Sequence, residues 1–284
     1  MHTTQHTSNT GSLYIVATPI GNLGDISQRM QTVLASVDLL ACEDTRHTGR
    51  LLTHLGIKAK LTSYHKENEQ QKTGYLLKQI ADGLDLALVS DAGTPGLSDP
   101  GAVLVQGARE KGIPVIPVPG PSALATALSV SGLQGAGFYF GGFLAAKTGE
   151  RVKQLKTLRG LTCPMIFYEA PHRIQATLKD CLQVFGDREA QLFRELTKLH
   201  EEHLSGPLSQ LIEHTNGKVR GELVLIINGQ PEHKEERPDN LDELILWYRD
   251  TGKTSLKDAA RLIAQDLDLP RSQVYRQALS IWKE

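Results

Sequence analysis

Short apolar runs alternate with amphipathic stretches along the first half of the chain. Each apolar run is about five residues long and is bounded by polar or turn-forming residues, which is typical of buried strands. The predicted strands are Leu13–Ala17, Asp38–Cys42, Lys60–Tyr64, Leu86–Ser90 and Pro114–Val118. The segments between them, such as Ile26–Val37 and Gly101–Lys111, have helical spacing. This alternation predicts βαβ units and an open parallel sheet, in which ligands bind outside the carboxyl ends of the strands.

The pattern changes after a helix that is predicted from about Pro121 to Ser131–Gly132. Strands and helices become more mixed, and the predicted strands are Phe138–Phe143, Met165–Glu169, Ala190–Glu195 and Glu222–Ile227. We expect a second, α+β domain. The predicted division is a flexible tail at 1–12, an α/β domain at 13–134, the α+β domain at 135–228, a linker at 229–240 and a helical module at 241–284.

The predicted linker contains two prolines and a charge cluster, with no apolar residue to bury between Gly229 and Pro238. Beyond it, residues 255–279 have the pattern of a helix-turn-helix. The first helix has one apolar face, a turn spans Asp266–Pro270, and the second helix carries two arginines. The positions concerned are Leu256, Ala259, Ala260 and Ile263, then Val274 and Leu279, with Arg271 and Arg276. Docking on RNA and a packing or dimerisation role remain equal alternatives, because eight basic and eight acidic residues balance from Arg237 onward.

Composition limits the cellular context and the partners. The chain has 284 residues, of which 40% are hydrophobic, and no apolar run is long enough to cross a membrane. Its three cysteines, Cys42, Cys163 and Cys181, are far apart and odd in number, so neither a disulfide framework nor a cysteine zinc site is expected. We therefore predict a cytoplasmic protein. A net charge of −1 gives no global signature of nucleic-acid binding, so contacts with RNA would depend on local patches.

Three loops that follow predicted strands are unusually rich in small residues. They are "ATPIGNLGD" at 17–25, "SDAGTPGLSDPG" at 90–101 and "PVPGPSALATAL" at 117–128. Small side chains let backbone N–H and C=O groups approach a ligand, and together the loops can line one cleft. Tight turns explain any single loop as well. Neither the Rossmann glycine pattern nor the phosphate-binding loop with its lysine is present.

Six segments in the same order resemble the tetrapyrrole-methylase-like S-adenosylmethionine methyltransferases. They are "LYIVATPIGNLGD", "ACEDTRHTGRLL", "SDAGTPGLSDPG", "PVPGPSALATAL", "FYEAPHRI" and "RGELVLI". The resemblance covers about Leu13 to Asn228. It is closest to the branch that 2′-O-methylates a cytidine of small-subunit ribosomal RNA, which also carries a C-terminal extension.

The resemblance implies the two-domain α/β fold of this family, known as the class III methyltransferase fold, with a small C-terminal helical module. It also implies a homodimer without a membrane partner, and a folded S-adenosylmethionine bound in a cleft between the domains. Carried over by position, the cofactor-binding residues are Pro19, Ala92, Gly93, Thr94, Leu97, Ser122, Ala123, Glu169 and Leu196. Asp91 is added to this set because it, like Asp99, can accept hydrogen bonds from the ribose or an amino group; an Asx-turn role is equally possible for both.

A ribose 2′-hydroxyl is a poor nucleophile unless it loses its proton, so a base or a cation that stabilises the alkoxide is expected. Charged side chains gather in "CEDTRHTGR", "EAPHR" and "RELTKLHEE", each where a predicted strand ends. Lys198 serves as the base if desolvation lowers its pKa, and Glu43 or Asp44 can orient the hydroxyl. Arg46 and Glu195 complete the predicted catalytic set. Surface solvation or salt bridging is the alternative for each of these residues.

Two further patterns have weaker implications. The segment "HEEH" at 200–203 lacks a third ligand, so no metal site is predicted. A basic stretch at 145–160 contains Lys147, Arg151, Lys153, Lys156 and Arg159 against a single acid, and can contact phosphates or form a solvated helix face. Two other functions remain open, which are methylation of a tetrapyrrole on carbon and binding of S-adenosylmethionine without catalysis.

Overall fold

The computed structural model describes residues 10–134, 137–231, 240–250 and 254–282. The chain forms two compact units, Met1–Gln230 and Pro231–Glu284, and each is described by itself. Most of the predicted flexible tail, residues 1–9, lies outside the described residues. The rest of the predicted tail is held in place, because the N–H of Gly11 donates to the carbonyl of Ile80 and the N–H of Ser12 donates to Asp85.

The first sheet of the larger unit contains five parallel strands. They are β1 (Leu13–Val16), β2 (Leu39–Cys42), β3 (Leu61–Ser63), β4 (Leu86–Val89) and β5 (Val115–Val118). The order is β3-β2-β4-β1-β5, so all five predicted strands are present and lie in one sheet. In β1, Val16 pairs with both Val89 of β4 and Val118 of β5, which brings the carboxyl ends of three strands to one edge.

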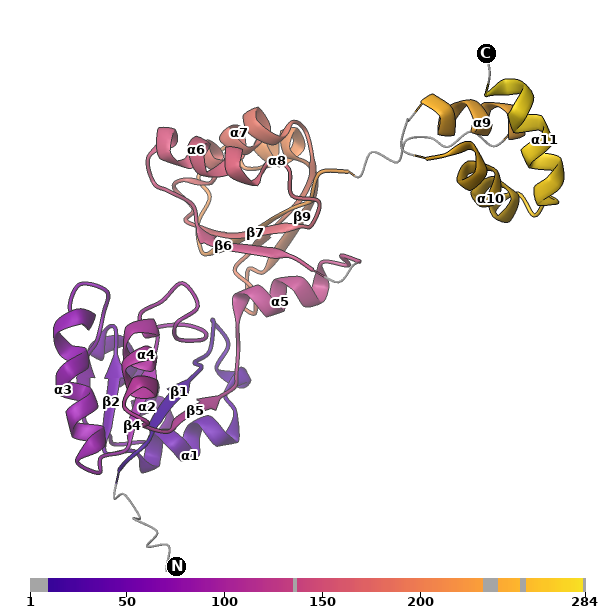
Figure 1. Ribbon diagram of the computed structural model, residues 1–284. Coiled ribbons are helices and arrows are strands. Elements are labelled where there is room, and N and C mark those ends of the chain that lie inside the picture. Colours follow the sequence, from indigo (N-terminus) through magenta and orange to yellow (C-terminus); the bar gives the residue numbers. More distant parts are fainter. Residues whose placement is uncertain (1–9, 135–136, 232–239, 251–253, 283–284) are drawn as a thin grey trace, which may run out of the picture. The chain divides into compact units, whose positions relative to one another are not determined.

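Helices cover both faces of this sheet (Figure 1). They are α1 (Gln28–Ser36), α2 (Thr45–Leu55), α3 (Glu69–Ala81) and α4 (Ala102–Glu110), with a 3₁₀ turn, η1, at Leu23–Asp25. Buried residues of α1 and α2 pack in one apolar cluster, and those of α3 and α4 pack in another. Strands β2 and β4 are largely buried between these helices and are continuous apolar runs, and that is why the sequence identified them.

The second sheet is mixed. Its strands are β6 (Tyr139–Phe143), β7 (Met165–Glu169), β8 (Glu189–Arg194), β9 (Glu202–Pro207) and β10 (Leu223–Ile227), in the order β6-β7-β10-β8-β9. Three helices, α6 (Thr148–Leu158), α7 (Ile174–Phe185) and α8 (Leu208–His214), cover one face (Figure 1). On the other face, α5 (Ala123–Val130) packs Leu124 and Ala127 against the sheet.

Strand β9 was not predicted from the sequence. It pairs antiparallel with β8 and lies at the edge of the sheet. Pro207 pairs with Glu189 at one end of the ladder, and Glu202 pairs with Arg194 at the other. Most of its side chains are exposed or half-buried, so it lacks the apolar alternation by which the other strands are recognised. The predicted linker also begins later than expected, since the N–H of Gln230 donates to the carbonyl of Leu161; residues 232–239 lie outside the described residues.

The smaller unit is helical. It contains α9 (Leu241–Asp250), α10 (Leu256–Asp266) and α11 (Arg271–Ile281), and the predicted apolar face of α10 is buried. One prediction for α11 is wrong: Leu279 is exposed, and Ala278 packs in the core beside Val274. In the parts of the chain that the structure describes, none of the helices is sufficiently long and apolar to span a bilayer.

Candidate active site

The three loops rich in small residues meet at the carboxyl ends of β1, β4 and β5. Thr18 and Gly93 exchange backbone hydrogen bonds of 2.9 and 3.1 Å, which join the first loop to the second. The hydroxyl of Thr94 donates to the carbonyl of Pro121 at 3.2 Å and joins the second loop to the third. The sequence predicted that these loops line one cleft, and their hydrogen bonds bring them together.

A cavity of about 360 Å³ opens beside these loops. Its walls come from the loops after β4 and β5 and from the ends of β7 and β10 of the second sheet. The lining residues are Ile20, Glu43, Asp91, Ala92, Gly93, Thr94, Leu97, Asp99, Ser122, Ala123, Phe143, Tyr168, Glu169, Ala170, Pro171, Leu196, Gly221, Glu222, Leu223 and Val224. Its volume is within the range of small-molecule sites, which combine apolar walls with a few polar groups.

Nine of the ten residues predicted to bind the cofactor line this cavity; the exception is Pro19, which lines a neighbouring hollow. The backbone at Gly93 favours glycine, because its φ of 80° is one that residues with a side chain rarely adopt. A bare backbone here, with the hydroxyls of Thr94 and Ser122 nearby, fits a nucleoside that lies against the loop. The residues therefore suit the predicted cofactor in size and in donor set.

Three of the acidic residues that line this cavity, Glu43, Asp91 and Asp99, come from the loops after β2 and β4. Burial, together with the nearby charges of Asp99 and Asp91, raises the pKa of Glu43 to about 7. Burial also raises the pKa of Asp99 to about 6, against the effect of a hydrogen bond from Ser90. Asp91 accepts the N–H of Asp44 at 3.2 Å, so it joins two loops. Crowded carboxylates suit a ligand that carries positive charge, as a sulfonium does.

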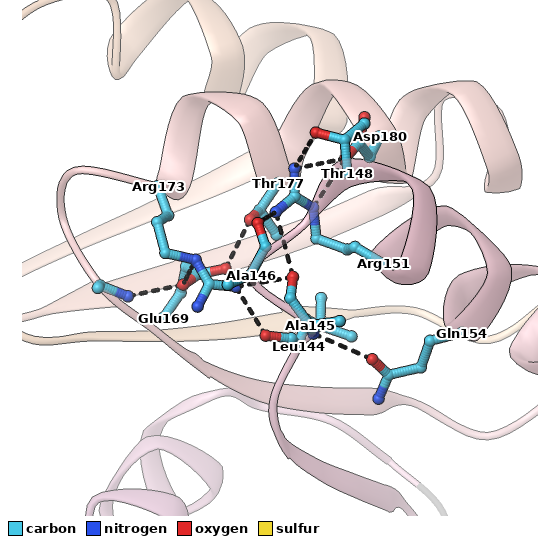
Figure 2. Close-up of polar contacts among 11 residues, drawn as sticks. Leu144, Ala145, Ala146, Thr148, Arg151, Gln154, Glu169, Arg173, Thr177 and Asp180 are labelled. Atoms are coloured by element: carbon cyan, nitrogen blue, oxygen red, sulfur yellow. Dashed lines mark hydrogen bonds and ion pairs between the residues drawn. The ribbon is translucent and has the colours of Figure 1, made fainter.

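The carboxylate of Glu169 is used inside the protein, although the residue lines the cavity. It accepts hydrogen bonds from the Ala170 N–H and the Thr177 hydroxyl, and its Oε1 lies 3.2 Å from Nε of Arg173. Arg173 in turn donates to the carbonyls of Leu144 and Ala145 (Figure 2). This network holds the chain just after β6 beside the cavity wall. The Glu169 side chain is fully buried, so a ligand in the cavity contacts other atoms of this residue and not its carboxylate oxygens.

The position of Arg151 contradicts the prediction that it belongs to a phosphate-binding or solvated face within the basic stretch at 145–160. Its side chain is only 2% exposed, and its Nε donates to Asp180 at 2.7 Å. Its Nη1 also donates to the carbonyls of Ala145 and Ala146 (Figure 2). Arg151 therefore stabilises the start of α6 and is not available to a phosphate, while Lys153 on the same helix is exposed.

Lys198 lies between two acidic side chains, 2.7 Å from Oε1 of Glu195 and 2.8 Å from Oε2 of Glu222. Partial burial alone would lower its pKa, but the hydrogen bonds to Glu195 and Glu222 outweigh burial and the pKa of Lys198 is raised. The condition for Lys198 to serve as the base, a lowered pKa, is therefore not met, and Lys198 is a cation at neutral pH. The hydrogen bond from Lys198 lowers the pKa of Glu195, which also accepts the N–H of Glu222.

Three of the five predicted catalytic residues, Asp44, Arg46 and Glu195, line neither this cavity nor the neighbouring hollow. Asp44 caps α2, because its Oδ1 accepts the N–H of Arg46 at 2.8 Å, and this backbone hydrogen bond lowers the pKa of Asp44. The side chain of Arg46 is 86% exposed and lies 3.5 Å from Asp44. Capping is thus the role that the structure gives Asp44.

A second hollow of about 350 Å³ adjoins the first cavity. Pro19, Gly21 and Lys198 line it, together with residues of α2. Among the described residues, no group of three or more His, Cys, Asp or Glu is arranged to hold a metal ion. His203, which belongs to "HEEH", stacks on Phe193 with ring centroids 4.3 Å apart.

Some residues of the second sheet and its loops that line the first cavity were not predicted from the sequence. Phe143, Gly221 and Val224 line it, but they were not predicted as site residues. "RGELVLI" was recognised as a motif and contains Gly221 and Val224. The sequence motif therefore pointed to the start of β10. Nothing in the sequence around Phe143 distinguishes it from an aromatic residue of the core.

Comparisons with known proteins agree with this geometry. The model of the family "Tetrapyrrole (Corrin/Porphyrin) Methylases" matches residues 12–212. A curated relative, "Ribosomal RNA small subunit methyltransferase I" of Vibrio cholerae, is 47% identical over 272 residues, which is 94% of each chain. The protein of the same name in Escherichia coli O157:H7 is 45% identical and 95% of each chain is covered.

Solved structures share the fold at lower identity. A uroporphyrin-III C-methyltransferase from Thermus thermophilus, complexed with S-adenosyl homocysteine, superposes with a TM-score of 0.57 at 18% identity, over 78% of this chain and 98% of that one. The methyltransferase CobJ gives 0.59 at 17% identity, over 78% and 95% of the two chains. Because these identities are low, the two structures establish the fold alone.

Proposed function

The chain belongs to the tetrapyrrole methylase family, and from this premise we propose that it methylates small-subunit ribosomal RNA with S-adenosylmethionine as the methyl donor. In finer detail, we propose that the acceptor is the 2′-hydroxyl of a cytidine. The observation that carries the proposal is the cavity beside the three loops, which is lined by nine of the ten residues expected to bind the cofactor. Identity of 47% to an enzyme named for this substrate supports the choice of RNA.

The cofactor supplies a methyl group on a sulfonium that is already activated for displacement. The protein must then align the acceptor hydroxyl, exclude water and remove a proton. Glu43 is the best-suited base, because its pKa of about 7 is close to the working pH and it faces the cavity. Lys198 is a cation held by Glu195, and it can stabilise the oxygen as negative charge develops.

The residues that line the first cavity provide the surfaces and charges that S-adenosylmethionine needs. Ala92, Gly93 and Ala123 provide surface without bulky side chains, and Leu97 and Leu196 form apolar walls. The hydroxyls of Ser122 and Thr94 stand at the same wall. Asp91 and Asp99 provide negative charge that suits a ligand with an ammonium and a sulfonium group.

The test is methyl transfer from radiolabelled S-adenosylmethionine to three acceptors in parallel: small ribosomal subunits, naked ribosomal RNA and a tetrapyrrole precursor. The subunits should come from a strain that lacks the enzyme. Label in the subunits or the RNA is the expected result. Label only in the tetrapyrrole would replace the proposal by carbon methylation, and cofactor binding without any transfer would indicate a non-catalytic protein.

The position of the methyl group needs a separate measurement. A methylated 2′-hydroxyl blocks alkaline cleavage of the adjacent phosphodiester, because that cleavage needs the free hydroxyl as nucleophile. Alkaline digestion of the labelled RNA should therefore leave the label in an uncleaved dinucleotide that contains cytidine. Label in a mononucleotide would place the methyl group on the base.

We also propose that the protein acts in the cytoplasm as a homodimer. The support is the resemblance noted from the sequence, together with apolar side chains such as Val130 and Phe138 that are 57% and 49% exposed in the single chain. Light scattering coupled to gel filtration tests this directly, and a mass of one chain at micromolar concentration would contradict it.

A further inference from the structure

Helix α2 presents a row of basic side chains to the second hollow. His47, Arg50 and His54 all line it and are all exposed. Their spacing of three and four residues places them on one face of the helix, while Thr48 and Leu52 on another face are buried. The helix, Thr45–Leu55, contains no acidic residue, so its own charges leave this face positive.

Arg50 is the strongest cation of this row. Among the described residues, neither an ion pair nor a hydrogen bond engages its guanidinium, whereas Lys198 across the hollow is held by Glu195 and Glu222. A guanidinium binds phosphate through two parallel N–H groups, and an imidazole N–H adds a single donor. The row therefore offers the donor chemistry that phosphate oxygens need.

The two cavities adjoin each other and differ in the charged side chains that line them. They share four lining residues, which are Ile20, Asp91, Ala92 and Glu222. Every charged side chain that lines the first cavity in the described structure is a carboxylate. The second hollow is lined by Arg50, Lys198 and two histidines beside the shared carboxylates of Asp91 and Glu222, and Glu222 is already paired with Lys198. A cationic methyl donor is favoured on the first side and an anionic ligand on the second. The acceptor must meet the donor where the linings of the two cavities come together, beside the four shared residues.

We propose that the second hollow holds the sugar-phosphate backbone of the RNA beside the acceptor nucleotide, with Arg50 as the main phosphate anchor and His47 and His54 as further donors. This inference rests on the proposed function, since it assumes an RNA acceptor. Seven residues of helix separate His47 from His54, or about 10 Å at 1.5 Å per residue. That length is sufficient for more than one nucleotide of a single strand, whose axial rise is about 3.4 Å when stacked.

The decisive variant is Arg50→Ala, with Arg50→Lys as the conservative partner. Arg109→Ala is the matched control, because Arg109 is an exposed arginine near the end of another helix, α4, and lines neither cavity. For each protein we would measure methylation of small ribosomal subunits as KM and kcat, and the dissociation constant of S-adenosylmethionine by calorimetry. Retained cofactor binding also shows that each variant is folded.

We expect Arg50→Ala to raise KM for the subunits about tenfold or more, as befits removal of a hydrogen bond to a charged group, and Arg50→Lys to recover part of this effect. The dissociation constant of S-adenosylmethionine and the kinetics of Arg109→Ala should not change. The logarithm of kcat/KM falls with the logarithm of salt concentration, and for a single strand this slope should become shallower by about 0.7 for each phosphate that the variant no longer neutralises.

Two results would overturn the inference while the proposed function stands. One is an unchanged KM and salt slope in Arg50→Ala with a methylating wild type. The other is weaker binding of S-adenosylmethionine by Arg50→Ala, which would assign Arg50 to the carboxylate of the cofactor. If the wild type transfers no label to ribosomal subunits or RNA, the proposed function itself fails, and the inference fails with it.

Discussion

The ammonium nitrogen of Lys198 lies 2.7 Å from Oε1 of Glu195, at the wall of the second hollow. Glu195 has a φ of 53°, an unusual backbone conformation for a residue with a side chain, and its carboxylate also accepts the N–H of Glu222 at 3.0 Å. The pair therefore fixes where the cation stands. Strained backbone of this kind is often retained at functional sites, where the surrounding structure holds it.

The first prediction concerns the charge of Lys198. We expect Lys198→Ala to lower kcat by about 10²- to 10³-fold, the usual cost of losing one group that stabilises a developing oxyanion. Lys198→Arg should lose less, because it keeps the positive charge. The dissociation constant of S-adenosylmethionine should stay within about twofold in both, since the residue lines only the second hollow. An unchanged kcat in Lys198→Ala would remove it from the mechanism.

The second prediction concerns pH and Glu43. A base must be deprotonated to act, so kcat/KM should rise with pH up to about 7, the raised pKa of Glu43, and then become constant. Glu43→Gln should remove this rise and lower the upper plateau by about 10²- to 10⁴-fold. The measurement is a pH profile of kcat/KM for small ribosomal subunits. A wild-type profile without this rise, or a rise that persists in Glu43→Gln, would assign the base elsewhere.

The third prediction concerns stability and Asp99. Its pKa rises from 3.8 to about 6 on folding, chiefly through burial. Between these values the folded protein binds more protons than the unfolded chain, so Asp99 lowers the free energy of unfolding as pH rises through this window. Asp99→Asn should therefore have the same Tm as the wild type near pH 4 and a Tm a few degrees higher at pH 7. Calorimetry at several pH values tests this, and a lower Tm at pH 7 would contradict it.

Much of the fold follows from local pattern. Val16 and Val89 lie in strands covered on both faces, and buried strands are continuous apolar runs that the sequence shows directly. Strand β9 was missed because it lies at a sheet edge, where polar residues are favoured and a run such as Glu202–Pro207 resembles a loop. Leu279 shows a further limit, because a helical pattern cannot tell which of two adjacent apolar residues faces the core.

The candidate site was predictable where backbone chemistry decides it. Gly93 and Ser122 stand in loops whose small residues mark the approach of a ligand, and both line the first cavity. Side-chain roles were harder, because they depend on partners distant in sequence. Lys198 pairs with Glu222, 24 residues further along, and this contact helps to raise a pKa that would have to be lowered for Lys198 to act as a base. Arg151 likewise looks like a surface cation until Asp180 is placed beside it.

The fourth prediction concerns this buried pair. Arg151 is almost fully buried, so removal of its partner leaves an uncompensated charge inside the protein. We expect Asp180→Ala to lower the free energy of unfolding by about 3 to 5 kcal/mol. Lys153→Ala, on the exposed face of the same helix, should change it by less than about 0.5 kcal/mol. Urea unfolding followed by circular dichroism measures both, and equal effects would show that the pair does not stabilise this helix.

The fifth prediction concerns Gly21, over which the side chain of Lys198 passes. A Cβ at Gly21 would clash with Cγ of Lys198, and the φ of 147° is one that side chains rarely adopt. Gly21→Ala should therefore displace the Lys198 ammonium from its place beside Glu195.

Because a shift of about 1 Å in a catalytic group can cost about 10²-fold in rate, we expect kcat of Gly21→Ala to fall by at least tenfold while S-adenosylmethionine binding persists. Gly149→Ala is the control, since no atom lies within 4 Å of a Cβ at that helical position. The combination Gly21→Ala with Lys198→Ala should be no slower than Lys198→Ala alone, because both changes remove the same interaction. Additive losses in the double variant would mean that Gly21 acts on turnover by a route independent of Lys198.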